Sequence, residues 1–143
     1  SLLAALVGLS LFTPVAGVAQ RLAPLPADST QRAQQYVRWF TTAQTDSLWP
    51  HVVQGSTATY ASKEALGTFL NQFKERSGKL GDVIEERWGW RNGTRMFWHT
   101  RALVDGPEPM VLRLILNTDG RLAGHGVQLL SSAPVPDSMA VAR

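Results

Sequence analysis

Residues 110–130 hold the feature that most limits how this chain can fold, which is two β-strands joined by a tight turn. Leu112, Leu114 and Leu116 recur at every second position, which is the period of a strand with one buried face. The turn at 117–120 ends in glycine, which accepts a positive φ without a Cβ clash. A lone hairpin cannot bury its apolar face, so the rest of the chain is expected to supply more strands and covering helices.

Two further strands are predicted upstream, at 82–90 and 94–104, with a turn at Asn92-Gly93 between them. Successive side chains of a strand point to opposite faces. One face of the 94–104 strand therefore carries Met96, Trp98, Thr100, Ala102 and Val104, and the other carries Arg95, Phe97, His99, Arg101 and Leu103.

Helices are expected at 29–44, 47–54 and 62–77, where apolar residues recur at helical spacing. Pro50 restricts the second helix, because proline is tolerated only in the first turn. Ser62 is a natural N-cap for the third. Helices followed by four strands predict an α+β fold, with three N-terminal helices packed on a curved four-stranded antiparallel sheet.

The N-terminal segment resembles a secretory signal peptide. Residues 2–12 are apolar but fewer than the roughly 20 that a transmembrane helix needs, and small residues follow at 16–19. We expect a signal peptide at 1–19 that is cleaved after Ala19, a secreted or periplasmic protein, and no stable membrane span after cleavage. A buried N-terminal helix and an uncleaved anchor are the alternatives. Residues 20–28 are expected to be an extended leader, 29–131 the folded domain and 132–143 a flexible tail.

Composition excludes several classes of function. The net charge of +3 is modest and the basic residues are scattered, whereas a nucleic-acid partner requires a clustered positive face. The absence of cysteine excludes disulfides, thiolate metal sites and cysteine nucleophiles. The three histidines show no metal-ligand spacing, and there is neither a G-x-S-x-G elbow nor a phosphate-binding glycine loop. We therefore expect no cofactor, no metal and no nucleic-acid partner.

Three groups of residues carry a family resemblance over about 29–131. They are Ala33, Tyr36, Val37 and Phe40 with Thr45-Asp46 and Leu48-Trp49; Leu66, Phe69 and Leu70 ahead of Gly78 and Gly81; and Leu112, Leu114 and Leu116 followed by 117–124. This pattern resembles the nuclear-transport-factor-like superfamily, which shares a cone-shaped fold with cystatins and ketosteroid isomerases. It is more narrowly similar to a small exported bacterial domain of unknown function often found ahead of serine hydrolase domains. The resemblance implies a pocket between helices and sheet, and dimerisation through the sheet. No residues match the isomerase Tyr and Asp pair.

Two candidate sites follow from the strands. A cationic face could bind a carboxylate or similar anion if it lines the cone, or form a dimer interface or a solvated face if it lies outside. Its residues are Arg95, Phe97, His99, Arg101, Arg113 and His125. An aromatic wall for an apolar ligand could be built from Trp88, Trp90 and Trp98, for which core packing is the alternative.

The leading hypothesis is an exported, non-enzymatic domain that binds a small apolar or anionic molecule or a protein, and that forms a homodimer through its sheet. The second is a pocket enzyme of the isomerase, dehydratase or hydrolase type that uses a histidine or a carboxylate. The third is an accessory domain that docks onto a separate hydrolase. A carboxylate facing a histidine inside the pocket would favour the enzyme.

Overall fold

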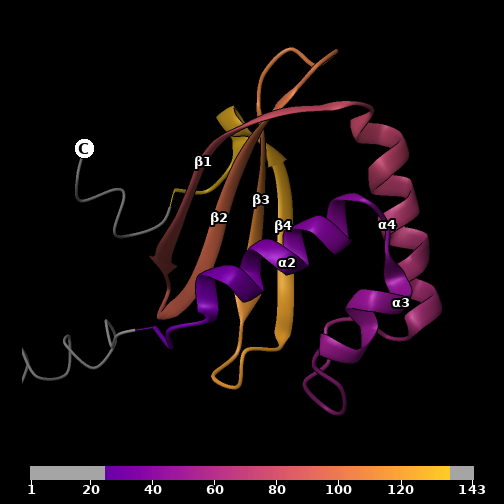
Figure 1. The fold of residues 1–143 in the computed structure, drawn as a ribbon, viewed down its shortest axis with the longest axis vertical. Helices are drawn as coiled ribbons and strands as arrows, with labels where there is room; N and C mark the ends of the chain where they lie inside the picture. Colours follow the sequence, from indigo (N-terminus) through magenta and orange to yellow (C-terminus); the bar gives the residue numbers. More distant parts are fainter. Residues whose placement is uncertain (1–24, 136–143) are drawn as a thin grey trace, which may run out of the picture.

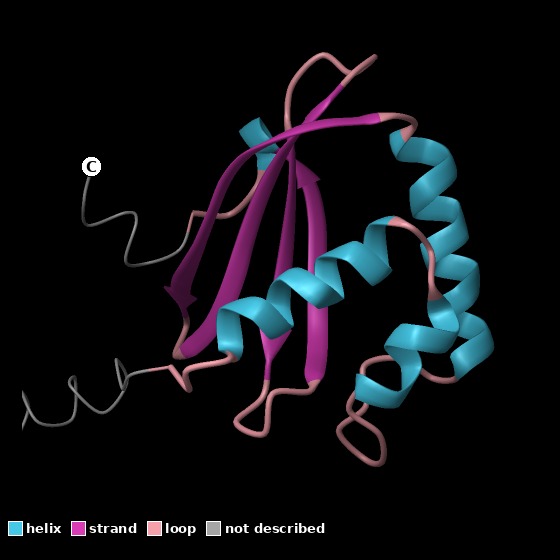
Figure 2. Cartoon of the chain, viewed as in Figure 1, coloured by secondary structure: helices cyan, strands magenta, loops and turns pink. Residues whose placement is uncertain are grey.

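Three α-helices precede a four-stranded antiparallel sheet in the computed structural model, which describes residues 25–135 (Figures 1 and 2). The signal-peptide prediction for 1–19 lies outside the described residues. The elements are α2 (Ser29–Thr41), α3 (Thr45–Leu48), η1 (Trp49–His51), α4 (Lys63–Ser77), β1 (Leu80–Arg91), β2 (Thr94–Leu103), β3 (Met110–Leu116), β4 (Leu122–Leu129) and η2 (Leu130–Ser132), where η marks a 3-10 turn. The predicted α+β fold is confirmed at this level.

The sheet follows chain order, β1-β2-β3-β4, and every neighbouring pair is antiparallel. The predicted hairpin turns are present. Asn92 and Gly93 have φ of 50° and 76°, and Gly120 has φ of 85°. These positive values are the ones that asparagine and glycine tolerate best, which explains why the dipeptides mark the turns.

The first two helices differ from the predicted ranges. The helix expected at 29–44 ends at Thr41, and Ala43 has a φ of 55°, which stops helical propagation. The helix expected at 47–54 begins earlier, at Thr45, and becomes a 3-10 turn at Trp49. Pro50 has no N–H to donate to the carbonyl four residues before it, so the α-helix cannot continue. The prediction for 62–77 is close, because Ser62 accepts a hydrogen bond from the Ala65 N–H at 3.1 Å.

The helices cover one face of the sheet, and the main core lies between them. In Figure 1, α2 crosses in front of the strands and α4 lies beyond β4. Phe40 and Leu70 from the helices are fully buried with Leu112 and Leu114 from β3. The Tyr36 hydroxyl donates to the Gly120 carbonyl at 2.7 Å, which fastens α2 to the β3–β4 turn.

A smaller apolar cluster occupies the opposite face of the sheet. Met96, Trp98 and Val111 are buried there, and Ala133 packs against them after η2. Pairing of Trp88 with Phe97, and of Arg87 with Trp98, confirms the predicted division of the 94–104 strand into two faces.

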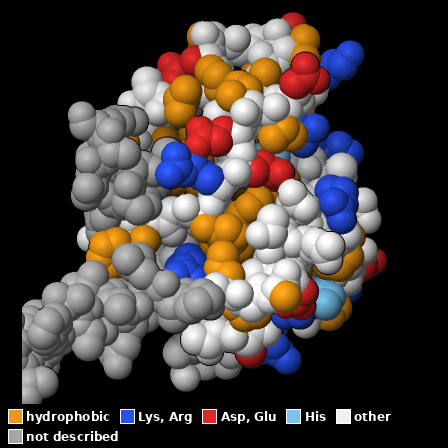
Figure 3. Space-filling model, turned by 60° about the vertical axis from the view of Figure 1, so that its left-hand side comes forward, with side chains coloured by type: hydrophobic (Ala, Val, Ile, Leu, Met, Phe, Trp, Pro, Cys, Tyr) orange, Lys and Arg blue, Asp and Glu red, His pale blue; other side chains and the backbone are white. Residues whose placement is uncertain are grey.

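The surface on the β1 side carries mixed charge. In Figure 3, Lys and Arg side chains on the described part of this face are interspersed with Asp, Glu and hydrophobic side chains. The visible part of this face therefore has no single positive patch of the kind that nucleic-acid binding requires. Between residues 25 and 135, no helix has the length and apolar character to cross a bilayer.

Candidate functional site

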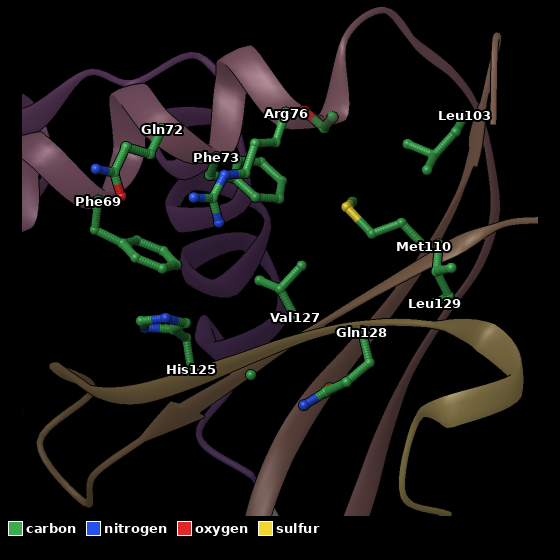
Figure 4. Close-up of a pocket in the computed structure, with 12 residues that line it drawn as sticks. Phe69, Gln72, Phe73, Arg76, Leu103, Met110, His125, Val127, Gln128 and Leu129 are labelled. Atoms are coloured by element: carbon green, nitrogen blue, oxygen red, sulfur yellow. The ribbon is translucent and has the colours of Figure 1, made fainter.

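A cavity of about 460 Å³ lies between the C-terminal half of α4 and the C-terminal half of β4 (Figure 4). Its size falls within the range of about 300–1,000 Å³ that is usual for ligand pockets. The lining residues are Phe69, Gln72, Phe73, Arg76, Ser77, Leu103, Met110, His125, Gly126, Val127, Gln128 and Leu129.

The apolar walls come from helix and strand periodicity. Phe69 and Phe73 are four residues apart, so they share one face of α4. His125, Val127 and Leu129 alternate along β4 and face the helix layer. Met110 pairs with Leu129 across the β3–β4 ladder and closes the cavity on the strand side.

His125 forms one end of the cavity and is embedded in an aromatic cluster. Its ring centroid lies 4.5 Å from that of Phe69 and 5.1 Å from that of Phe40, and it stacks on Tyr60. Burial, assisted by the positive charge of Arg113, lowers the pKa of His125 to about 4. His125 is therefore neutral at pH 7.

The His125 ring is held in place by its contact with Tyr60. The Tyr60 hydroxyl lies within hydrogen-bond distance of His125 Nδ1, and burial raises the pKa of Tyr60 above its usual value. The phenol therefore stays protonated, and it shares one hydrogen bond with Nδ1 in which either group can be the donor. This arrangement supplies an uncharged polar group at one end of the cavity.

The polar residues of the cavity on α4 are Ser77, which is partly buried, and Gln72 and Arg76, which are four residues apart and exposed to solvent. Figure 4 shows the Arg76 side chain extending from the helix over the cavity, above Val127. None of the described residues that line the cavity is acidic. The site is therefore apolar inside, with a cation on its α4 side.

His99 lies elsewhere, in a polar pair between α2 and the sheet in which the imidazole is buried and the Glu86 carboxylate is partly exposed. Its Nδ1 is 2.9 Å from Glu86 Oε2, and Gln34 donates to the other carboxylate oxygen at 3.0 Å. Burial lowers the pKa of His99, although the adjacent Glu86 opposes this effect. A carboxylate does face a histidine, but neither residue lines the cavity. The pair therefore could not act on a molecule bound in the cavity. Its hydrogen bonds connect α2 to β1 and β2.

The predicted cationic face is not assembled as one site. Arg113 pairs with Trp98 in the ladder, so it lies on the opposite face from His99, and it donates to Gln128 at 2.9 Å. Arg101 donates to the Gly81 carbonyl, and Phe97 is part of the core. Only His125 of the six residues lines the α4–β4 cavity. Arg113 lies on β3, and the pairing register between β2 and β3 determines which face of the sheet it occupies. The sequence pattern does not show that register.

Arg95 lines a second cavity, of about 670 Å³, near the start of α2 and the 117–120 turn. Arg32 occupies its polar side by donating to Asp28 at 2.6 Å and to the Asp119 carbonyl at 3.1 Å. Because Arg32 is already partnered and acidic groups line the same cavity, this space offers a weaker ligand site.

The aromatic wall predicted from three tryptophans is also split by the sheet. Trp88 packs edge-on against Phe97 with ring centroids 5.2 Å apart, and its Nε1 donates to Thr30. Trp90 shares the face of Trp88 by strand alternation, whereas Trp98 lies on the other face. Trp88 pairs with Phe97, and Trp98 pairs with Arg87, so Trp88 and Trp98 lie on opposite faces of the sheet. One cavity wall therefore cannot contain all three tryptophans.

Sequence reasoning missed the residues of α4 that line the cavity, and it missed Tyr60. Phe69 and Phe73 belong to an apolar helical stripe, which is typical of core packing, and Arg76 belongs to the polar end of the same helix. A cation following a clean apolar stripe gives no signal of a site until the facing strand is known. Tyr60 lies in a loop that Thr59 ties to the Ala123 carbonyl, a contact that no periodicity predicts.

Within residues 25–135, no group of three or more His, Asp or Glu side chains could hold a metal ion. Comparisons of the chain with protein families, with curated proteins and with solved structures found no match.

Proposed function

We propose that this chain is a binding domain for a small, largely apolar molecule, without catalytic activity, and that its site is the cavity between α4 and β4. The observation that carries the proposal is the cavity itself. A cleft of about 460 Å³ that is open to solvent lies beside a core whose leucines and Phe40 are fully buried. Apolar walls with a few polar groups are typical of ligand pockets.

The family resemblance supports the same proposal. Members of the nuclear-transport-factor-like superfamily often hold a pocket between helices and sheet, and this cavity lies between α4 and the sheet. Membership of that superfamily, curvature of the sheet into a cone, and export through a signal peptide belong to the proposal. Dimerisation and docking onto a hydrolase stay predictions.

Filling the cavity should strongly weaken binding of an amphiphilic probe with a large aromatic body. The probe is 1-anilinonaphthalene-8-sulfonate, whose fluorescence rises when it leaves water. We expect saturable binding to the unmodified chain. For Val127→Trp we expect a roughly tenfold lower affinity, because the larger side chain occupies the space that the probe needs. The measurement is a fluorescence titration, with thermal unfolding to verify that the variant is folded.

Val83→Trp is the matched control. Val83 is 49% exposed and does not line the cavity, so the same substitution there should leave the titration unchanged. If Val127→Trp does not fold, Leu129→Trp fills the cavity from a position that is already 38% exposed. Equal probe binding by a folded cavity variant and the control would refute the proposed site.

A further inference from the structure

The geometry points to a ligand class for this site, an amphiphilic carboxylate free in solution, with its head group on Arg76 and its alkyl body inside the cavity. This inference rests on the proposed function and adds the chemistry of the ligand. Its basis is a guanidinium placed over an apolar cavity that has no acidic lining residue in the described chain.

Arg76 is available to a ligand. It makes no hydrogen bond or ion pair with any other residue between 25 and 135. Its side chain extends over the cavity in Figure 4, and Gln72, one turn earlier, offers an amide on the same side. A guanidinium binds a carboxylate through two parallel N–H donors, so these two residues could hold the head group together.

The interior favours an alkyl chain. Phe73, Met110 and Val127 present no polar side-chain atom that could compensate a charge, and an ion there would lose its hydration. His125 is neutral at pH 7 because its pKa is about 4, so it offers no counter-charge at the inner end. The charged end of a ligand must therefore stay near the α4 side, while the apolar end enters.

The preference for an anion depends on one side chain. Arg76 lies in the last turn of α4, which ends at Ser77. That end of a helix carries the negative pole of its dipole, so the backbone does not attract an anion there. Removing the Arg76 charge should consequently remove the discrimination between a carboxylate and a neutral head group.

The test compares octanoate with 1-octanol, two probes of equal chain length, by isothermal titration calorimetry on the full chain. We expect octanoate to bind roughly tenfold more tightly, as is typical for one charge-assisted contact. In Arg76→Gln the ratio of the two affinities should fall to about one. Lys74→Gln removes the same charge from the same helix at a position that does not line the cavity, so its ratio should stay near ten.

The outcomes separate this inference from the proposed function. Equal binding of the two probes, or an unchanged ratio in Arg76→Gln, would overturn the carboxylate class, while the loss of both probes in Val127→Trp would still support the cavity. Failure of both probes to bind would remove the proposed function as well. Binding to phosphatidylglycerol vesicles without binding to octanoate would indicate that the anion is a lipid head group in a membrane. That result would overturn the proposal of a carboxylate ligand free in solution.

Discussion

Phe40→Ala is expected to destabilise the fold by about 3–5 kcal/mol, the usual cost of truncating a fully buried phenylalanine. Phe40 is 0% exposed, and its ring meets Phe69, Phe73 and His125 at centroid distances of 5.8, 5.3 and 5.1 Å. It therefore joins α2 to both α4 and β4. Truncation leaves a void at the junction of three elements, which cannot close without moving α4.

The measurement is equilibrium urea unfolding of the two proteins, which gives the free energy of unfolding of each. Val83→Ala is the control, because Val83 is 49% exposed and should change stability by less than about 0.5 kcal/mol. A loss below about 1 kcal/mol for Phe40→Ala would mean that the three elements do not pack around this ring.

Acidification from pH 6.5 to pH 4 is expected to remove about 3 kcal/mol of stability through His125 alone. The folded state holds the pKa of His125 at about 4, below its ordinary value of 6.5. Between these values the unfolded chain binds the proton and the folded chain does not, so the free energy of unfolding decreases as the pH falls. Stability is therefore full above about pH 6.5 and declines through this window.

The variant that isolates this effect is His125→Gln, which does not titrate in this range but can still form a hydrogen bond with Tyr60. It should be less stable at pH 7, because it loses the aromatic packing, yet its free energy of unfolding should vary much less between pH 6.5 and 4. His99, whose pKa is also lowered by burial, supplies part of the slope that remains. Parallel pH profiles for the two proteins would show that His125 is not buried in the neutral form.

Local patterns in the sequence predicted the elements, because their causes are local. The stripe of Leu66, Leu70 and Phe73 defines α4, and the Asn92-Gly93 and Asp119-Gly120 turns define the hairpins. Strand alternation also placed Phe97 and Trp98 on opposite faces. Each of these depends on residues a few positions apart in the chain.

The candidate site could not be predicted in the same way, because it depends on contacts between distant segments. The ladder places Arg113 on the opposite face from His99, and no pattern within either strand fixes that relation. The cavity exists because α4 lies beside β4, which brings Arg76 and Val127 to one space. The pair of Glu86 and His99 likewise joins β1 to β2, and Gln34 of α2 donates a hydrogen bond to the same carboxylate.

Chemical-shift mapping of probe binding on the ¹⁵N-labelled chain tests the central claim most directly. On titration with 1-anilinonaphthalene-8-sulfonate, we predict saturable shifts concentrated in the amides of 69–77 and 125–129, which line the cavity from α4 and β4. The 117–120 turn, which lines the second cavity, should stay unchanged. Shifts confined to that turn or to exposed residues of β1, or no saturable shift at all, would contradict a ligand site between α4 and β4.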